Sequence, residues 1–278
     1  MTVLAGMKYS SVDDVAVVDD MVADDNWVMQ QKMDGTRAIV RITERSIDFY
    51  GANGHPLKHT AAMQHFDTIR ASLDFLREET MGGHLTLDGE LMIRTGEYRV
   101  FDFVAPALNQ QTRYSLLTPY LAPAGSAVSV VAQWESSADK RTMLTRLYDE
   151  GVEGVVFKRR DGLYLHGIRS NEVVKYKFIQ TADVVVLSSS RSRNEAGREV
   201  GAFVFAIPDD EGELIPLGAC SAIGKPHVEV GDVIEVAYLY RDNTGGLVQP
   251  RMTRVRKDKM PWECSDDQFR AYTREEVK

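Results

Sequence analysis

The sequence changes character near residue 180, and this change limits the folds that the chain can adopt. Beyond that point short apolar runs alternate with Gly, Asp, Asn and Pro turns, and no long helical pattern is present. Short strands at this spacing are typical of a small OB-type β-barrel. They are predicted at 184–187, 202–207, 214–217, 233–240 and 252–255. Since 278 residues suit two domains better than one, we predict a first domain over 1–180 and an OB-fold domain over 181–278.

The first domain mixes strands and helices along the chain, which predicts an α+β fold with antiparallel sheets. Strands are expected at 27–29, 38–42, 46–50, 85–93, 99–104, 128–132, 153–158 and 173–178, and helices at 60–79 and from Ser136 or Ser137 to Gly151. Residues 1–26 are expected to form a lead-in with one short edge element at 15–18. Residues 105–125, rich in Pro, Leu and Ala, are expected to form a surface connection.

The stretch 30–37, QQKMDGTR, places charged residues between two apolar runs. This pattern predicts a strand, a tight turn and a second strand, with Lys32, Asp34 and Arg37 at the turn. A lysine in such a place becomes a nucleophile when burial or nearby cations favour its neutral amine. A solvated hairpin turn is the plain alternative.

Three other strands carry residues suited to a binding site. Asp88 and Glu90 are two apart and share a strand face, where they repel unless a cation or a sugar hydroxyl lies between them. An ordinary Asp-Gly hairpin is the alternative there. Lys175 and Lys177 also share a face, which suits a phosphate, although an exposed sheet face explains them equally well. Phe101 could stack on a base or fill the core.

Composition excludes some classes of protein. The net charge of −8 argues against a broadly basic surface, so any nucleic-acid footprint has to be local. The two cysteines, Cys220 and Cys264, cannot form a four-thiolate zinc site. The sequence shows no apolar run near about 20 residues and no secretion-signal pattern, so we expect no membrane contact and a cytoplasmic location.

Taken in order, these segments resemble the covalent nucleotidyltransferases, which have an ATP-grasp-like ligase domain, and most closely the ATP-dependent DNA ligases in their minimal two-domain form. The matching segments are KMDGTR at 32–37 for the KxDGxR motif, DGE at 88–90, Phe-Asp at 101–102, EGVVFK at 153–158 for EGVxxK, the stretch 164–177 ending in KxK, and RKDK at 256–259 for RxDK. Each segment is weak alone, and their shared order makes the resemblance specific.

The resemblance implies a ligase that uses ATP and Mg²⁺ (or Mn²⁺). Lys32 would form a lysyl-adenylate, pass AMP to the 5′-phosphate of nicked duplex DNA, and let the 3′-hydroxyl displace it. Such enzymes serve DNA repair and DNA replication, and we expect a monomer of bacterial origin, or of viral origin in the host cytoplasm. The nucleotide-binding residues implied are Gln31, Arg37, Glu90, Phe101, Glu153, Lys175, Lys177, Arg256 and Lys259, with Glu153 and Glu90 also binding the metal.

Two departures from the family pattern stand out. The family's Ser-Arg pair, whose arginine contacts the nick phosphate, is replaced by YGANG at 50–54, leaving Arg45 or His55 as substitutes. A glutamate common beside the nucleophile is replaced by Gln30 and Gln31. The alternatives are an RNA ligase, an mRNA-capping guanylyltransferase and a non-catalytic OB-fold nucleic-acid-binding protein.

Overall fold

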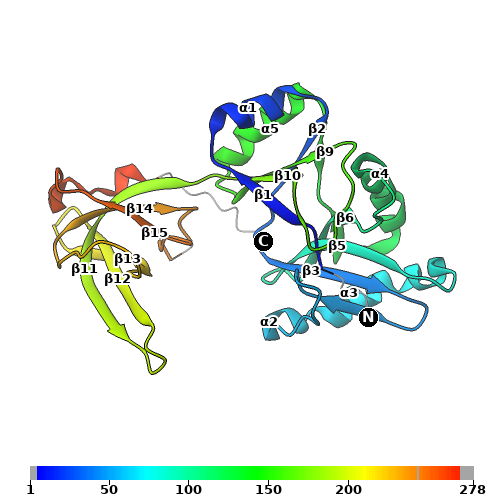
Figure 1. The fold of residues 1–278 in the computed structure, drawn as a ribbon, viewed down its shortest axis with the longest axis horizontal. Coiled ribbons are helices and arrows are strands. Elements are labelled where there is room, and N and C mark those ends of the chain that lie inside the picture. Colours follow the sequence, from blue (N-terminus) through cyan, green and yellow to red (C-terminus); the bar gives the residue numbers. More distant parts are fainter. Residues whose placement is uncertain (1–4, 243, 270–278) are drawn as a thin grey trace. The chain divides into compact units, whose positions relative to one another are not determined.

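The structure, a computed structural model, describes residues 5–242 and 244–269. The chain forms two compact units, Met1–Lys177 and Phe178–Lys278 (Figure 1). None of the helices within the described ranges is both long and apolar enough to cross a membrane. The sequence also predicts a polar tail over 263–278, of which residues 270–278 lie outside the described residues.

Two five-stranded sheets form the framework of the first unit. The first sheet has the order β1 (Lys8–Val12), β10 (Arg169–Lys177), β9 (Gly154–Arg159), β2 (Trp27–Gln31) and β8 (Gln133–Trp134). The second has the order β4 (Ile47–Tyr50), β3 (Thr36–Ile42), β5 (Leu85–Met92), β6 (Glu97–Phe103) and β7 (Val128–Val130). Neighbouring strands are antiparallel except in the pairs β1–β10 and β6–β7.

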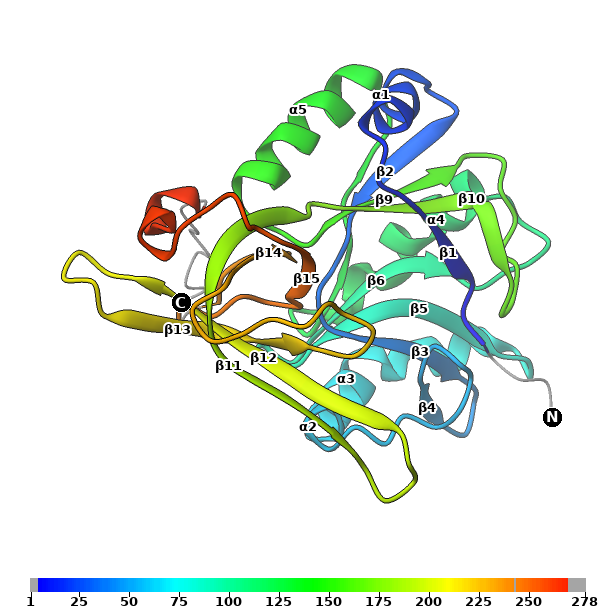
Figure 2. The ribbon, with the colours of Figure 1, turned by 60° about the vertical axis from the view of Figure 1, so that its left-hand side comes forward.

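Helices cover each sheet. Helices α1 (Val15–Ala23) and α5 (Ser137–Asp149) lie side by side and pack on the first sheet (Figure 2). The second sheet is covered by α3 (Phe66–Leu73), the short helix η1 (Asp74–Thr80) and α4 (Gln110–Leu121), with α2 (Thr60–Met63) and η2 (Ala122–Ala124) beside them. Buried aliphatic and aromatic side chains fill the space between them, among them the stacked rings of Phe49 and Phe66, 4.0 Å apart.

Three predictions need correction where the structure has helices. The expected surface connection at 105–125 contains the twelve-residue helix α4. Its buried positions include Gln110 and Arg113, so the sequence shows no apolar stripe there. The edge element expected at 15–18 is part of helix α1, whose N-cap Asp14 accepts a hydrogen bond from Ala16 N. The single helix expected at 60–79 is divided into α2, α3 and η1.

The loop that contains Lys32 is not a hairpin turn. Strand β2 before it pairs with β8 and β9, whereas β3 after it pairs with β4 and β5 in the other sheet. Residues 32–35 therefore carry the chain from one sheet to the other. This crossing places Lys32 where side chains of both sheets can meet.

The second unit is one antiparallel sheet of five strands, as the sequence predicts. The order is β13 (Leu214–Ser221), β12 (Glu199–Pro208), β11 (Gln180–Arg193), β14 (Val233–Tyr238) and β15 (Arg251–Val255), and the edge strands β13 and β15 contact each other. The short helices η3 (Pro261–Glu263) and η4 (Asp266–Gln268) follow. Apolar side chains from all five strands form its core, including Val184, Phe203, Phe205, Leu217, Ile234 and Met252.

Candidate active site

A pocket of about 310 Å³ in the first unit is lined by residues of both sheets. Six residues that the sequence places in the site contribute to its wall: Gln31, Lys32, Arg37, Glu90, Phe101 and Lys175. Strands β2, β9 and β10 bring in one set of side chains, and β3, β5 and β6 the other. The chain crossing at 32–35 thus joins the two halves of one pocket.

Lys32 is held by a carboxylate that it shares with a second lysine. Its Nζ lies 2.5 Å from Glu153 Oε2, and Lys177 Nζ lies 2.8 Å from Glu153 Oε1. The Glu153 side chain is only 3% exposed, so both contacts form away from bulk water. The Lys32 backbone also donates to Gly154 O at 2.8 Å. One buried anion therefore offsets two cations and fixes the direction of the Lys32 side chain.

Gly154 is required for this arrangement. Its φ is +151°, and a Cβ at this position would lie 2.1 Å from Tyr176 O. The close approach of β9 to β10, in which Gly154 pairs with Lys177, brings Glu153 within reach of the Lys177 ammonium.

Lys175 adds a further positive charge to the pocket wall. The pKa of its ammonium is lowered, mainly by burial and then by the neighbouring charges of Lys177 and Lys32. A bound anion would relieve this repulsion. Lys32 and Lys175 at the pocket wall, with Lys177 close by and only Glu153 to offset them, therefore favour an anionic ligand.

Arg37 is fixed by a bidentate ion pair with Asp88. Its Nε and Nη2 donate to the two carboxylate oxygens at 3.0 and 2.6 Å, and its Nη1 donates to Met7 O at 2.8 Å. Asp88 is fully buried on β5 and also accepts from the Tyr164 hydroxyl at 2.5 Å. The Asp-Gly hairpin alternative for this segment is wrong, because β5 continues through Gly89 to Met92.

Glu90 lies on the same strand, is less deeply buried than Asp88 and lines the pocket. Burial raises the pKa of its carboxyl to about 7, although the charges of Lys32 and Arg37 oppose the shift. Glu153 is the other predicted metal-binding carboxylate, and in this structure its two oxygens are paired with Lys32 and Lys177. Among the described residues there is no group of three or more His, Cys, Asp or Glu side chains placed to hold one. This donor set fits Mg²⁺, which in such sites takes one or two carboxylates and completes its shell with substrate phosphates and water.

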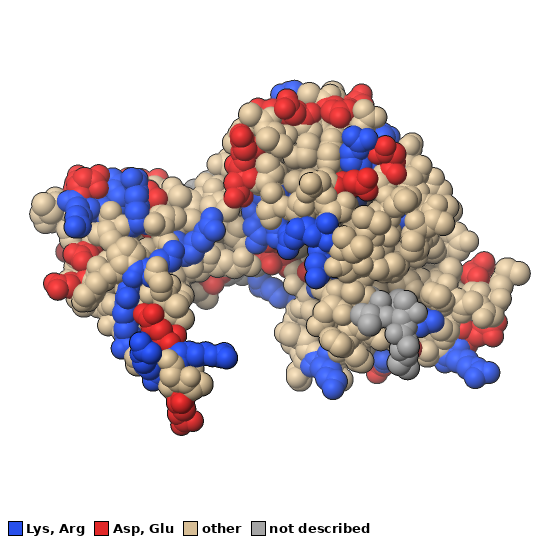
Figure 3. Space-filling view, viewed as in Figure 1, with Lys and Arg blue, Asp and Glu red and all other residues tan. Residues whose placement is uncertain are grey.

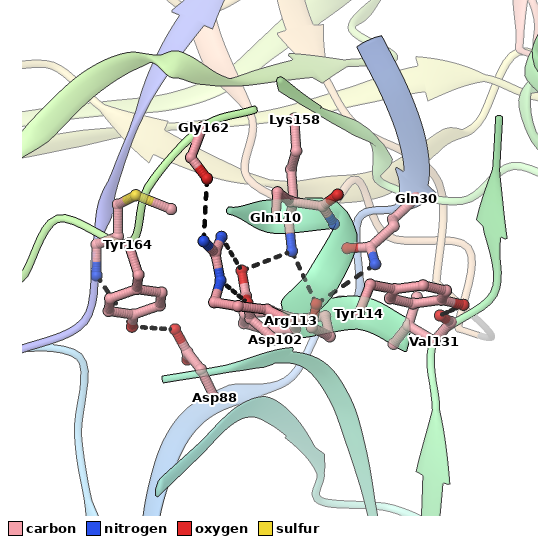
Figure 4. Close-up of polar contacts among 12 residues, drawn as sticks. Gln30, Asp88, Asp102, Gln110, Arg113, Tyr114, Val131, Lys158, Gly162 and Tyr164 are labelled. Atoms are coloured by element: carbon pink, nitrogen blue, oxygen red, sulfur yellow. Dashed lines mark hydrogen bonds and ion pairs between the residues drawn. The ribbon is translucent and has the colours of Figure 1, made fainter. Parts of the chain in front are cut away.

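Asp102, Arg113 and Lys158 form a buried ion network (Figure 4), which also supports Phe101. Asp102 accepts from Arg113 Nε at 2.7 Å and lies 3.2 Å from Lys158 Nζ. Lys158 Nζ also donates to Phe101 O at 2.8 Å and lies 5.1 Å from the Phe101 ring centre. Burial lowers the pKa of the Lys158 ammonium, with the Asp102 charge opposing. The network holds the Phe101 main chain in place at the pocket wall.

Several lining residues were not predicted. They include Lys8, Tyr9, Gln30, Val156, Lys158 and Arg169. Strand β1 pairs Lys8 with Arg169 across a parallel ladder, and Arg169 donates to Tyr9 O. Lys158 and Arg169 lie within the segments that resemble family motifs, so the sequence could have identified them as site residues. No sequence pattern identifies Lys8 and Tyr9, because a parallel pairing between strands 160 residues apart leaves no local signal.

Other predicted residues lie elsewhere. Arg256 and Lys259 belong to the second unit, where both pair with Asp183, at 2.7 and 2.9 Å. Their role toward a nucleotide stays a prediction. Arg45 and His55, the suggested substitutes for the missing arginine, are exposed and are not part of the pocket wall.

Charge on the first unit is unevenly distributed despite the net charge of −8. Figure 3 shows acidic side chains over the region of α1 and α5, and a band of Lys and Arg below it. The pocket residues Lys8, Arg169 and Lys175 come from the neighbouring strands β1 and β10. A local basic footprint therefore exists on a net acidic chain.

Comparisons with known proteins place this geometry in context. No protein-family model matches the chain. Over 84% of its length it is 25% identical to the multifunctional non-homologous end joining protein LigD of Mycolicibacterium smegmatis, and the match covers 36% of that protein. The chain thus spans little more than a third of the length of this curated relative.

Solved structures agree at the level of the fold. A mycobacterial DNA ligase D complexed with ATP and MES superposes with a TM-score of 0.52 at 22% identity, covering 94% of this chain and 98% of that one. A Lig E DNA ligase gives a TM-score of 0.62 at 18% identity, covering 90% and 99%. The mixed α+β fold is that of DNA ligase structures, and the resemblance to the ATP-dependent DNA ligases is confirmed.

Proposed function

We propose that this chain is an ATP-dependent DNA ligase that seals 5′-phosphate/3′-hydroxyl nicks in duplex DNA through a covalent lysyl-AMP intermediate. The observation that carries the proposal is the Lys32 amine at the wall of a pocket, held by Glu153, with Lys175 and Lys177 beside it. An amine nucleophile next to further cations suits attack on a phosphate. The names of the LigD relative and of the matching ligase structures support it.

In the first step the Lys32 ammonium would lose a proton, its Nζ would form an N–P bond to the α-phosphorus of ATP, and pyrophosphate would leave with the electrons of the broken P–O bond. Lys175 and Lys177 would lie against the phosphate and offset the charge that builds on it. Glu153 would keep Lys32 directed toward that phosphorus. Catalysis in this scheme comes from positioning and charge neutralisation.

The remaining pocket residues would bind the nucleoside. Phe101 and Val156 offer apolar surface for the faces of a purine. Arg37, locked by Asp88, would reach the ribose or the phosphates, and Gln31 lies next to the nucleophile. Glu90 would contact the ribose or a metal.

Glu153 and Glu90 would hold Mg²⁺ or Mn²⁺, which supplies positive charge at the phosphates when bound. From the second unit, Arg256 and Lys259 would orient the pyrophosphate. Both roles are proposals drawn from the family resemblance.

We infer that the first unit is the adenylation domain and that the second is an OB-fold domain. The strand order β13-β12-β11-β14-β15, with contact between the two edge strands, supports a barrel that closes on itself. Nicked duplex DNA would be the partner, in DNA repair or DNA replication. Action as a monomer in the cytoplasm stays a prediction.

Intact-mass measurement after incubation with ATP and magnesium, followed by nicked duplex DNA, tests the proposal. We expect a gain of one AMP that the DNA discharges as the nick is sealed, and no gain in Lys32→Ala. An adenylated Lys32→Ala protein would refute the assignment of the nucleophile. Discharge only by nicked RNA would indicate an RNA ligase, labelling by GTP alone a capping enzyme, and no adduct a binding module.

A further inference from the structure

A network of hydrogen-bonded glutamine side chains adjoins the pocket. Gln30 Nε2 donates to Phe101 O and to Gln133 Oε1, each at 3.4 Å, and Gln110 Nε2 donates to the same Gln133 oxygen at 2.8 Å. Gln133 Nε2 in turn donates to Glu135 Oε1 at 3.2 Å. Gln30 and Gln110 are almost completely buried. The network links the pocket residue Gln30 to the partly exposed carboxylate of Glu135.

The two ends of this network determine which way each glutamine amide is oriented, that is, where its oxygen and its NH₂ group point. A carboxylate only accepts hydrogen bonds, so Gln133 must present its NH₂ group to Glu135 and its oxygen to the other two glutamines. Glu135 is itself held by Arg160, whose Nη1 lies 2.7 Å from Oε2. Gln30 must therefore present its NH₂ group to Gln133.

Phe101 O imposes the same direction on Gln30. A main-chain carbonyl also only accepts, and this one accepts a second hydrogen bond from Lys158 Nζ at 2.8 Å. Two acceptors thus fix the orientation of the Gln30 amide through its NH₂ group. Its Oε1 has no hydrogen-bond partner among the described residues. Gln30 lines the pocket beside Phe101, so a ligand bound there would meet this oxygen rather than the NH₂ group.

An oxygen in this place distinguishes between purines. Adenine carries an amine at C6, which donates, whereas guanine carries a carbonyl, which accepts. A glutamine turned by 180° would present N–H groups and favour guanine. A site that hydrogen-bonds one partner rejects the other because its polar groups are left unpaired.

We propose that Gln133, anchored by Glu135, is a positioning residue that sets the base preference of the pocket by holding Gln30 with its oxygen toward the bound purine. The proposal rests on the proposed nucleotide-dependent function. Neither Gln133 nor Glu135 lines the pocket, so both act through Gln30. Without Gln133, only one weak acceptor at 3.4 Å would restrain the Gln30 amide.

The test compares the rates at which AMP and GMP adducts form on Lys32, with ATP and GTP supplied separately. Intact mass separates the two adducts, which differ by one oxygen atom. Gln133→Leu is expected to lower the ATP-to-GTP rate ratio by about fivefold, the value of one hydrogen bond. Glu135→Gln, a change at a half-exposed side chain, should lower the ratio in the same direction without threatening the fold.

Two further variants separate orientation from structure. Adding Gln30→Glu to Gln133→Leu should restore the preference for ATP, because a carboxylate has no N–H group to present whichever way it turns. Gln111→Leu, at an exposed neighbour of Gln110 on α4, is the matched control and should leave the ratio unchanged.

An unchanged ATP-to-GTP rate ratio in both Gln133→Leu and Glu135→Gln overturns the proposal. This includes the case in which both rates fall equally, which a purely structural role predicts. Failure of the double variant to recover its preference overturns the orientation argument. A wild-type protein that forms no adduct with either nucleotide instead overturns the proposed function.

Discussion

Replacing Glu90 by glutamine should stabilise the first unit at high pH. Burial raises the pKa of the Glu90 carboxyl from 4.5 to about 7. Below 4.5 the group is protonated in the folded and unfolded chains alike, and above 7 it is ionised in both. Between these values the folded chain binds more protons, so stability falls as the pH rises.

The size of the effect follows from the pKa values. One pH unit of pKa difference corresponds to about 1.4 kcal/mol, so the move from 4.5 to about 7 corresponds to about 3 kcal/mol. Glu90→Gln keeps the shape and removes the charge. We expect its free energy of unfolding to exceed that of the wild type by up to about 3 kcal/mol at pH 8.5. The difference should shrink by about 1 kcal/mol at pH 6.

Urea unfolding followed by tryptophan fluorescence measures this difference. In a Trp262→Phe background the emission comes from Trp27 and Trp134, both in the first unit. A glutamine variant that is less stable than the parent at pH 8.5, or whose advantage is the same at both pH values, would refute the reasoning. The same variant should adenylate poorly, since it loses a carboxylate proposed for the metal or the ribose.

Three other predictions concern the site. Lys177→Ala should slow lysyl-adenylate formation severely while circular dichroism shows an intact fold, and a near-normal rate would remove Lys177 from the site. Asp88→Asn should destabilise the first unit by about 3–5 kcal/mol in urea unfolding, because it leaves the largely buried Arg37 guanidinium without its anion; a loss below about 1 kcal/mol would contradict this. Chelation of divalent metal should abolish adduct formation without lowering the Tm, because the metal would be held only together with nucleotide phosphates. A clear fall in Tm on chelation would indicate a resident structural metal instead.

The strands could be predicted from sequence because alternation and turn residues are local signals. Strand β5, through Asp88 and Glu90, and strand β10, through Lys175 and Lys177, both lie where the pattern placed them. The partners of a strand are a different matter. Nothing near Lys32 distinguishes a hairpin from a crossing between two sheets, since the same residues end β2 and begin β3 in either case.

Buried polar groups account for the largest failure. Arg113 lies on a helix that was taken for a loop, because the side chains which that helix buries include a charged and an amide group. Its ion pair with Asp102 becomes visible only when both elements are in place. Gln110 and Gln133 were missed for the same reason, since an amide network leaves no periodic trace in the sequence.

The contact between Gly154 and the neighbouring strand bears on how surveys of random variants should be interpreted. An alanine at this position removes no group that could touch a nucleotide, yet its methyl group would force β9 away from Tyr176 O. Such a survey, scored by activity alone, would rank position 154 with position 32. A second score for abundance in the cell would separate them, because crowding the backbone lowers the yield of folded protein, whereas loss of a nucleophile does not.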